Sequence, residues 1–304
     1  MNIRIRNVPQ AFPYQGSKRK LAPALIKFVP EKTHRLVEPF AGSAAVSVAT
    51  AFLGNVGSFW LNDAHGALMA LWHRIIHDPD GLARNYMAMW EAQSGREREY
   101  YNQVRSDFNA SQKPELLLFL LARCVKAAIR YNRRGEFNNS PDHRRKGMMP
   151  GTMQETLRLV SDALGRGTKL TSVDYKQVLA QTTVTDFVFM DPPYQGVSKQ
   201  RDNRYVAGVD FDDFVLELES LNRRKVPYAV SYDGRTGEKT HGRKLPEHLQ
   251  LHHVEMLVGR STQATLLGRS EDTFESIYIS RDTIARQQSW PQAAKPHRTE
   301  LLFA

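Results

Sequence analysis

The sequence predicts an α/β fold built on a doubly wound, parallel sheet. Short apolar runs alternate with longer helical stretches, and several of these runs end in polar residues. A chain of 304 residues with 41% hydrophobic side chains can also bury a large core. Because such sheets bind ligands outside the carboxyl ends of their strands, those polar residues are the first candidates for a functional site.

The predicted elements follow one another in a regular order. The first unit is a strand, a tight turn from Pro39 to Ser43 and a buried helix over residues 44–52. The second strand ends at Asn62-Asp63, and a helix is expected over residues 65–77. The predicted strands cover residues 35–38, 58–61, 169–173, 186–190, 228–231, 252–257 and 275–279.

About a hundred residues separate the second and third strands, whereas an ordinary crossover needs only about a dozen. This stretch is therefore predicted to be an inserted, mainly helical domain. Residues 115–129 are expected to be helical, and Asn132 to Gly135 to form the turn of a β-hairpin. The predicted division is 1–66 and 161–283 for the two parts of the main domain, 67–160 for the insertion and 284–304 for a peripheral tail.

The chain is strongly basic, with 42 Lys and Arg against 32 Asp and Glu and a formal net charge of +10. Residues 123–146 alone hold eight Lys and Arg against two acidic residues. Tyr131, Phe137 and several Asn lie among these cations, and such mixtures suit base stacking and base-edge hydrogen bonds. The pattern favours a nucleic-acid partner, and a solvated surface loop is the alternative.

The sequence disfavours a secreted protein, a membrane protein and a metal-binding protein. The single Cys124 cannot form an intramolecular disulfide and no charged-then-apolar leader opens the chain, so a cytoplasmic location is expected. The longest apolar runs, such as residues 116–121, fall short of the ~18 residues that cross a bilayer, so no membrane contact is expected. His252 and His253 are neighbours in a strand and point to opposite faces, and no metal site is predicted.

The sharpest chemical signal is Asp191-Pro192-Pro193-Tyr194, directly after the apolar strand 186–190. Two successive prolines remove two backbone donors and stiffen the turn, which leaves carbonyl oxygens to accept hydrogen bonds. The Asp191 carboxylate and the Pro192 carbonyl are predicted to hold both N–H groups of an exocyclic amine, with Tyr194 stacked on the base. A loop with a helix-capping Asp is the alternative.

A second candidate site follows the first strand. Gly42, within the turn from Glu38 to Ala44, allows a backbone to approach a ligand closely, and Asp63 is placed to bind ribose hydroxyls. Packing alone also accounts for small residues at such a turn. A G-x-G-x-x-G pattern and a P-loop are both absent, which disfavours a nicotinamide enzyme and an NTPase.

In content and order, these residues resemble the Dam-type (α-class) DNA adenine-N6 methyltransferases. The similar segments are residues 12–21 (the N-terminal motif), 38–42 and 62–63 (two cofactor motifs), 130–138 (the Arg-Tyr-Asn-basic-basic-Gly hairpin), 174–175 (an acidic-aromatic pair) and 191–194 (the catalytic motif). They span residues 12–194 in patches, and the last third of the chain matches only loosely. Two departures are conservative: Ser43-Ala44 replaces more glycine-rich sequence, and Tyr14 stands where Trp is common.

The resemblance implies a Rossmann-like core that binds S-adenosyl-L-methionine, with the insertion as target-recognition domain. Asp63 would take ribose hydroxyls and Asp174 the adenine amino group. The implied cofactor residues are Tyr14, Gly16, Ser17, Lys18, Glu38, Pro39, Phe40, Gly42, Ser43, Asn62, Asp63, Asp174, Tyr175 and Asp191. The implied catalytic residues are Asp191, Pro192, Pro193 and Tyr194. The DNA-binding residues that the resemblance implies are Arg130, Tyr131, Asn132, Arg133, Arg134 and Asn138, and those predicted from the basic runs of the sequence are Arg144, Arg145, Lys146, Lys199 and Arg201.

The predicted function is methylation of the N6 amino group of an adenine flipped out of double-stranded DNA. The enzyme would be the modifying partner of a restriction endonuclease, or a solitary or phage modifier. The alternatives are a cytosine-N4 or RNA amino-methyltransferase and a catalytically inert DNA-binding protein. Residues 195–209 are expected to form a mobile loop over DNA, and residues 259–269 either contact phosphate or form a solvated hairpin.

Overall fold

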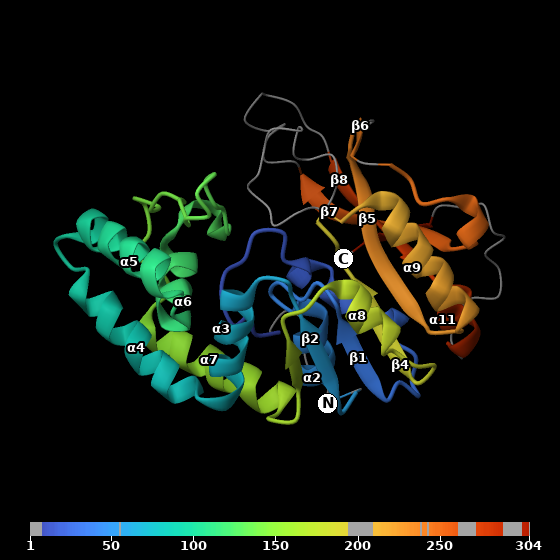
Figure 1. The fold of residues 1–304 in the computed structure, drawn as a ribbon, viewed down its shortest axis with the longest axis horizontal. Coiled ribbons are helices and arrows are strands. Elements are labelled where there is room, and N and C mark those ends of the chain that lie inside the picture. Colours follow the sequence, from blue (N-terminus) through green and yellow to red (C-terminus); the bar gives the residue numbers. More distant parts are fainter. Residues whose placement is uncertain are drawn as a thin grey trace.

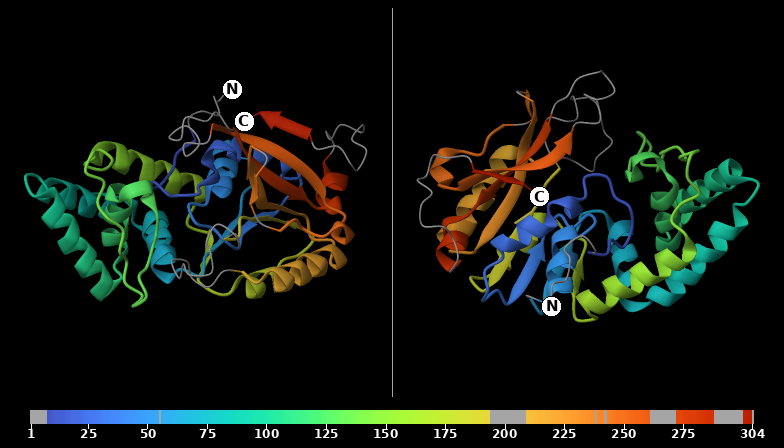
Figure 2. Two further views of the ribbon diagram at one scale, coloured as in Figure 1. Left: turned by 90° about the horizontal axis from the view of Figure 1, so that it is seen from above. Right: turned by 180° about the vertical axis from the view of Figure 1, so that it is seen from behind.

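The computed structural model describes residues 8–54, 56–193, 209–237, 239–241, 243–260, 272–287 and 300–303. Strands with helices on both faces form one end of the molecule, and the helices α4 to α6 form the other end (Figure 1). Figure 2 shows the same arrangement from two further sides, with the N-terminal segment (blue) between the two ends. The α/β fold class predicted from the sequence is confirmed.

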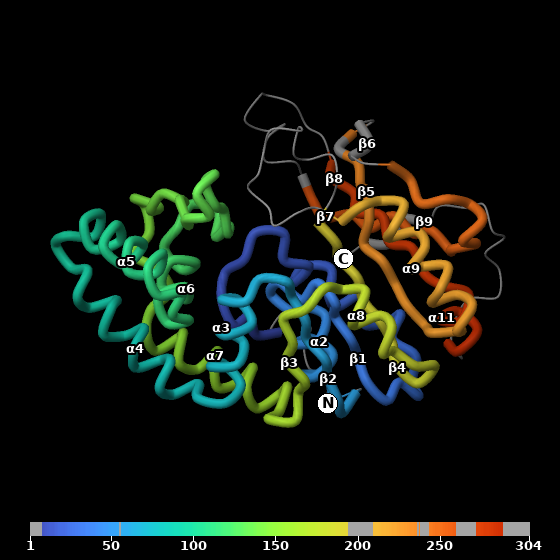
Figure 3. Tube along the Cα trace, viewed as in Figure 1, coloured from blue at the N-terminus to red at the C-terminus, as the bar shows by residue number. Residues whose placement is uncertain are grey.

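The strands form one sheet in the order β3-β2-β1-β4-β5-β8-β7-β9, and β6 pairs with β5. The course of the chain through them can be followed in Figure 3. The strands are β1 (Arg35–Glu38), β2 (Phe59–Asn62), β3 (Lys169–Thr171), β4 (Asp186–Met190), β5 (Tyr228–Thr236), β6 (Lys239–His241), β7 (His252–Arg260), β8 (Asp272–Ile279) and β9 (Glu300–Phe303). All seven predicted strands are present, with shifts of one residue or more at several ends.

The prediction of a parallel sheet is correct for β1 to β5 and wrong at β8. Strand β8 runs antiparallel to β5, and β7 runs antiparallel to β8. Only residues 261–271 connect β7 to β8, and a parallel connection needs a longer, usually helical crossover. The sheet is therefore mixed: β8 runs in the direction opposite to that of β1 to β5, whereas β7 and β9 run in the same direction as β1 to β5.

Alternate residues of the central strands face two separate cores, as a doubly wound sheet requires. Leu36 and Phe187 belong to one core, whereas Val37 and Val188 belong to the other.

The helices are α1 (Ala22–Leu25), α2 (Ala45–Leu53), α3 (Gly66–His77), α4 (Pro79–Ala92), α5 (Glu97–Ser111), α6 (Pro114–Arg123), α7 (Pro150–Leu164), α8 (Tyr175–Ala180), α9 (Phe211–Arg223) and α11 (Arg281–Arg286), with 3₁₀ turns η2 (Lys18–Lys20), η3 (Ile26–Phe28), η4 (Val125–Ala127) and η5 (Glu247–Leu249). Residues of α2 and α3 pack in the first core, and those of α8 and α9 in the second.

The stretch between β2 and β3 is helical, as predicted. Helices α3 to α7 pack on one another, and their buried side chains, such as Trp72, Tyr86 and Phe108, join the same core as the sheet residue Leu36. The helices therefore share a continuous apolar interior with one face of the sheet. The division into separate domains at residues 67 and 160 stays a prediction.

The prediction of a helix over residues 115–129 is wrong at its C-terminal end. Helix α6 ends at Arg123, where the backbone carbonyl accepts a hydrogen bond from the Asp142 amide (2.7 Å). Cys124 forms an antiparallel bridge with Pro141, and Lys126 has a φ of 61°. Pairing with the returning chain thus ends the helix, although the apolar composition continues. The predicted hairpin turn is confirmed by an antiparallel bridge between Tyr131 and Phe137.

Within the described residues, no helix has the length and apolar character needed to span a membrane. The same residues contain no group of three or more His, Cys, Asp or Glu side chains arranged to hold a metal ion.

Candidate active site

Three of the predicted motifs meet at the carboxyl ends of β2, β1 and β4. These strands are adjacent and parallel, with Glu38 opposite Leu61 and Val37 opposite Val188. The residues that follow the strands therefore emerge at one edge of the sheet, where such folds bind ligands.

The turn after β1 is held in a backbone conformation that favours glycine. Gly42 has a φ of 48°, and a Cβ atom added there would lie 3.1 Å from Cε1 of Tyr14. The Ser43 hydroxyl donates a hydrogen bond to Oγ of Ser17 (2.8 Å). Two of the predicted cofactor segments, residues 14–18 and 38–43, are thus packed against each other. Gly16, whose φ is 83°, lies in the first of them.

Asp63 ties the end of β2 to this turn. Its Oδ2 accepts a hydrogen bond from the Gly42 amide (3.0 Å), and its Oδ1 accepts one from the His65 amide (3.0 Å). Burial raises the pKa of Asp63, while these two amide donors lower it. Each carboxylate oxygen has a second lone pair, so the carboxylate can also accept hydrogen bonds from a ligand.

Asn62 has a different environment from its neighbour. Its side-chain amide donates to the carbonyl oxygens of Pro39 (2.9 Å) and Val173 (3.0 Å). Its Oδ1 accepts from the Thr171 hydroxyl (2.8 Å) and from the Val173 amide (3.1 Å). These bonds connect the end of β2 with the segments that follow β1 and β3. Asn62 therefore stabilises the backbone around the site.

Glu38 is a buried carboxylate at the end of β1. Its Oε1 accepts a hydrogen bond from the Ser47 amide (2.6 Å) in the first turn of α2. Burial raises the pKa of Glu38 to about 7, and the nearby charge of Asp191 acts in the same direction. The carboxyl group therefore changes its charge near neutral pH.

Replacing Glu38 with Gln is expected to weaken the pH dependence of the free energy of unfolding. The folded-state pKa of about 7 lies above the ordinary value of 4.5, so stability falls as the pH rises between these values. A shift of this size corresponds to roughly 3 kcal/mol. In urea titrations, Glu38→Gln should gain up to that amount over the unmodified protein between about pH 5 and 8.

The matched control for this prediction is Glu91→Gln, which changes an exposed carboxylate on α4. This variant should keep the pH dependence of the unmodified protein. If Glu38→Gln also keeps it, the buried carboxyl of Glu38 is ionised over the whole range and its assignment is wrong.

Lys18 connects the N-terminal segment to the predicted catalytic motif. Its Nζ lies 3.0 Å from Oδ1 of Asp191 and 2.6 Å from Oε1 of Glu275. All three side chains are largely buried, with exposed fractions of 11%, 22% and 17%. An ammonium at this distance favours the charged form of the Asp191 carboxylate. Sequence reasoning missed Glu275, although a Glu among apolar strand residues was a visible signal.

The structure describes two of the three other predicted catalytic residues. Pro192 is buried and Pro193 is partly buried directly beyond the end of β4. Tyr194 lies outside the described residues, as do Lys199, Arg201, the rest of residues 194–208 and residues 261–271.

Asp174 and Tyr175 begin helix α8, after β3. The Asp174 carboxylate caps this helix by accepting a hydrogen bond from the Lys176 amide (2.8 Å). The Tyr175 ring packs on Phe40, with ring centroids 5.0 Å apart and planes inclined by 35°. The Tyr175 hydroxyl is buried, and it has no hydrogen-bond partner within the part of the chain described here. Phe40 and Tyr175 thus bring an aromatic surface to the edge that carries Asp63.

The predicted DNA-binding hairpin contacts this edge. Nε2 of His65 is hydrogen bonded to the Tyr131 hydroxyl, and the two rings are stacked at a centroid distance of 5.5 Å. The Leu68 amide donates to Nδ1 of the same His65 ring (2.9 Å), so Nε2 is the atom that carries the proton. Burial lowers the pKa of His65, which keeps the imidazole neutral.

The cationic residues of the hairpin and of the loop after it are mostly exposed. Asn132 shapes the turn, because its Oδ1 accepts from the amides of Arg134 (2.9 Å) and Glu136 (3.0 Å). Two cations also form ion pairs, Arg145 with Asp142 (2.9 Å) and Lys146 with Glu97 (3.0 Å). Among the predicted DNA-binding residues, Arg133, Arg134, Asn138, Arg144, Arg145 and Lys146 are exposed, whereas Arg130, Tyr131 and Asn132 are partly buried.

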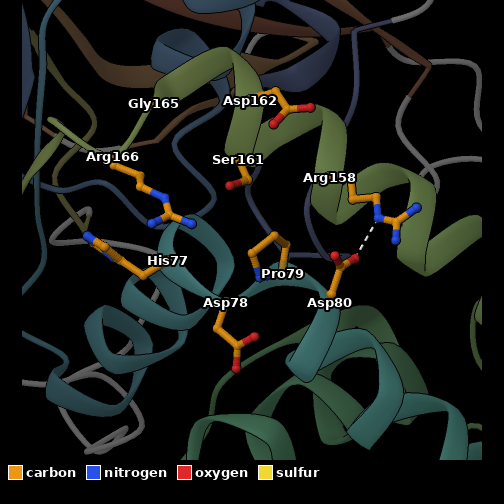
Figure 4. Close-up of a pocket in the computed structure, with 9 residues that line it drawn as sticks. All are labelled: His77, Asp78, Pro79, Asp80, Arg158, Ser161, Asp162, Gly165 and Arg166. Atoms are coloured by element: carbon orange, nitrogen blue, oxygen red, sulfur yellow. Dashed lines mark hydrogen bonds and ion pairs between the residues drawn. The ribbon is translucent and has the colours of Figure 1, made fainter.

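A polar pocket of about 490 Å³ lies at the opposite edge of the sheet (Figure 4). It is lined by the end of α3, the start of α4 and residues 158–166, which lead into the start of β3. An ion pair between Arg158 and Asp80 (2.5 Å) crosses part of it. None of the predicted site residues lines this pocket.

The chain is similar to a family of known proteins and to several of its members. Residues 14–259 match the family described as D12 class N6 adenine-specific DNA methyltransferase. The retron Ec67 DNA adenine methylase of Escherichia coli is 30% identical over 60% of this chain and 62% of its own length. The DNA N-6-adenine-methyltransferase of Escherichia phage P1 is 28% identical over 66% of this chain but only 26% of its own length.

A third relative, the DNA adenine methylase of Serratia marcescens, is 26% identical over 54% of this chain and 58% of its own length. The matched part of the chain thus spans less than two thirds of each of these three relatives. The resemblance noted from the motifs is nevertheless confirmed, because the family match covers most of the chain. The chain belongs to the D12 class N6 adenine-specific DNA methyltransferase family.

Proposed function

We propose that this protein is an S-adenosyl-L-methionine-dependent methyltransferase that modifies the N6 amino group of adenine in double-stranded DNA. The observation that carries the proposal is the position of Asp191. Its carboxylate lies beyond the end of β4 and is ion-paired with Lys18 (3.0 Å), while the Gly42 turn follows the adjacent strand β1. An amine acceptor and a nucleotide-binding turn thus share one edge of the sheet.

The residues at this edge fit S-adenosyl-L-methionine. Gly42 lacks a Cβ, and the Tyr14 ring lies where that atom would point, so an aromatic ring lies directly against the backbone of the turn. Phe40, packed on the buried Tyr175 ring, offers an apolar aromatic surface, and Asp63 offers a carboxylate to hydroxyl groups. Asp191 adds negative charge, which suits a sulfonium cation. When bound, this cofactor supplies a methyl group attached to positively charged sulfur.

The protein's own contribution to the reaction is to orient and polarise the amine. The nitrogen of an exocyclic amine is a poor nucleophile, because its lone pair is delocalised into the ring. Two acceptors, the Asp191 carboxylate and the Pro192 carbonyl, hold its two N–H groups and localise the lone pair on nitrogen. Alignment of that nitrogen with the methyl group supplies much of the remaining acceleration. We assign stacking on the base to Tyr194.

The basic hairpin supplies the contact with DNA. Arg133 and Arg134 are exposed at a turn whose neighbour Tyr131 touches His65, two residues from Asp63. A cation at this place binds phosphate close to the cofactor edge. A target amine inside a duplex is out of reach, so the base must be flipped out, at a cost of a few kcal/mol.

Removing the two hairpin charges with Arg133→Ala/Arg134→Ala is expected to weaken DNA binding and its salt dependence. Each phosphate contact contributes about 0.9 to the slope of log K against log salt concentration, so the slope should fall by up to about two. Fluorescence anisotropy at several salt concentrations measures this slope. The control Lys27→Ala/Arg223→Ala removes two exposed charges elsewhere. Equal slopes for both double variants would contradict the hairpin assignment.

The substrate class is tested by transfer of a labelled methyl group to matched polymers. Duplex DNA should accept the label, and structured RNA of the same length should not. Labelling of RNA alone would favour the RNA amino-methyltransferase. Cofactor binding without transfer to either polymer would favour a catalytically inert DNA-binding protein.

We propose a biological role as the modifying partner of a restriction endonuclease, or as a solitary or phage modifier, working in the cytoplasm on chromosomal or phage DNA. Type II methyltransferases occur among the relatives, for example one from Methanocaldococcus jannaschii that is 26% identical over 62% of this chain. Methylation of a restriction site removes it from the endonuclease's substrates. The presence in the same host of an endonuclease that cleaves the unmethylated motif, and not the methylated one, therefore distinguishes a restriction partner from a solitary modifier.

A further inference from the structure

Lys18 lies between two carboxylates that come from distant parts of the chain. Asp191 follows the parallel strand β4, and Glu275 belongs to the antiparallel strand β8. Strand β5 separates these two strands in the sheet. The Lys18 ammonium thus bridges across β5, at 3.0 Å from Asp191 and 2.6 Å from Glu275.

Glu275 occupies a position of β8 where the alternation of the strand predicts an apolar residue. It lies on the same face of β8 as Ile277 and Ile279, both of which belong to the buried core. A carboxylate in such a row is costly unless it is paired. Besides the Lys18 ion pair, Oε1 of Glu275 accepts a hydrogen bond from the Ser231 hydroxyl of β5 (3.1 Å), and Ser231 is fully buried.

We propose that Glu275 is a positioning residue for methyl transfer, which acts by fixing the Lys18 ammonium against Asp191. This inference rests on the function proposed above. A lysine has a flexible four-carbon stem and three donors, and a second carboxylate restricts where its ammonium can lie. With Lys18 fixed on Oδ1 of Asp191, the plane of the carboxylate that meets the target amine is also fixed.

The alternative is that Glu275 only stabilises the fold. Ion pairs of modest exposure often contribute little, and a Glu on β8 would then affect melting temperature without changing the reaction. The two roles differ in which kinetic constant changes. A residue that positions Asp191 lowers kcat, whereas loss of fold lowers the amount of active enzyme and leaves kcat per active site unchanged.

The first test is steady-state methylation of duplex DNA by Glu275→Gln, with the active fraction determined by cofactor titration. We expect kcat to fall about tenfold with KM for the cofactor unchanged within about twofold. The matched control is Glu255→Gln on the adjacent strand β7. Glu255 is also ion-paired, with Arg235 (2.8 Å), and its exposed fraction is 14%, close to the 17% of Glu275. Its replacement should leave kcat unchanged.

The second test is a double-mutant cycle with Lys18→Met. If Glu275 acts only through Lys18, the double variant Lys18→Met/Glu275→Gln should have the kcat of Lys18→Met within about twofold. Independent, multiplicative losses would contradict the proposal. Ser231→Ala keeps all three charges and removes the hydroxyl that donates to Glu275, so a smaller, few-fold fall in kcat is expected should Lys18→Met fail to fold.

The outcomes separate this inference from the proposed function. Full kcat in Glu275→Gln, with activity in the unmodified enzyme, would overturn only the role of Glu275. No methyl transfer to DNA by the unmodified enzyme would overturn the proposed function and the role of Glu275 with it.

Discussion

Asp191→Asn is expected to lower kcat by about a thousandfold while cofactor and DNA affinities change by no more than a few-fold. The substitution keeps the shape of the side chain but removes its charge, and it places donors where the amine N–H groups need an acceptor. It also leaves the Lys18 ammonium, now 3.0 Å from a carboxylate oxygen, opposite a neutral group. Single-turnover methylation with saturating cofactor measures the chemical step directly.

The control for Asp191→Asn is Asp162→Asn, which changes an exposed carboxylate on α7. It should retain the rate of the unmodified enzyme. A rate for Asp191→Asn within tenfold of the unmodified enzyme would show that another group accepts the amine.

Gly42→Val is expected to weaken cofactor binding by at least about a hundredfold. Valine is strained at a φ of 48°, and its Cβ would lie 3.1 Å from the Tyr14 ring, so the turn or the ring must shift. The Gly42 amide also donates to Asp63, so a displaced turn disturbs the carboxylate assigned to the ribose. Isothermal titration with S-adenosyl-L-methionine measures the affinity.

Gly54→Val separates backbone strain from the close approach of the turn. Gly54 also has a positive φ, of 74°, but a Cβ there meets no atom within 4 Å. This variant is expected to lose stability at the end of α2 and to keep its cofactor affinity. Equal losses of affinity in both variants would show that the turn at Gly42 is not the binding element.

The sequence was sufficient to predict the parallel half of the sheet and the residues at its edge. Glu38 is the last residue of β1, Asp63 and Asp191 directly follow β2 and β4, and parallel neighbours bring the carboxyl ends of these strands together. For these residues, the local composition and the sheet topology both predict a position at the carboxyl ends of the strands. The turn at Asn132 was predictable for the same reason, because Asn-Arg-Arg-Gly determines its backbone shape locally.

The other features depend on contacts between residues far apart in the chain. The direction of β8 follows from the short connection after β7, and it is this direction that brings Glu275 toward Lys18. The end of α6 at Arg123 depends on a hydrogen bond with Asp142, which no local propensity shows. The stacking of His65 on Tyr131 likewise joins two motifs that sequence reasoning treated separately.

Asn62 and Asp63 show how neighbouring residues can differ in role. Both are polar residues at one strand end, and the sequence assigned both to the cofactor. In the structure, the Asn62 amide bonds to backbone groups of two loops, while Asp63 contacts the glycine turn itself. Asn62 therefore supports the site, and its distinction from Asp63 needs the arrangement of β1, β2 and β3.

The identity of the methylated nucleoside shows directly whether the enzyme modifies the N6 amino group of adenine in DNA. Unmethylated genomic DNA is incubated with the protein and S-adenosyl-L-methionine, digested to nucleosides and analysed by mass spectrometry, and a second portion is sequenced for modified bases. An adenine-N6 methyltransferase should leave N6-methyladenine at one short sequence motif. N4-methylcytosine, or no modified nucleoside from protein that binds the cofactor, would contradict it.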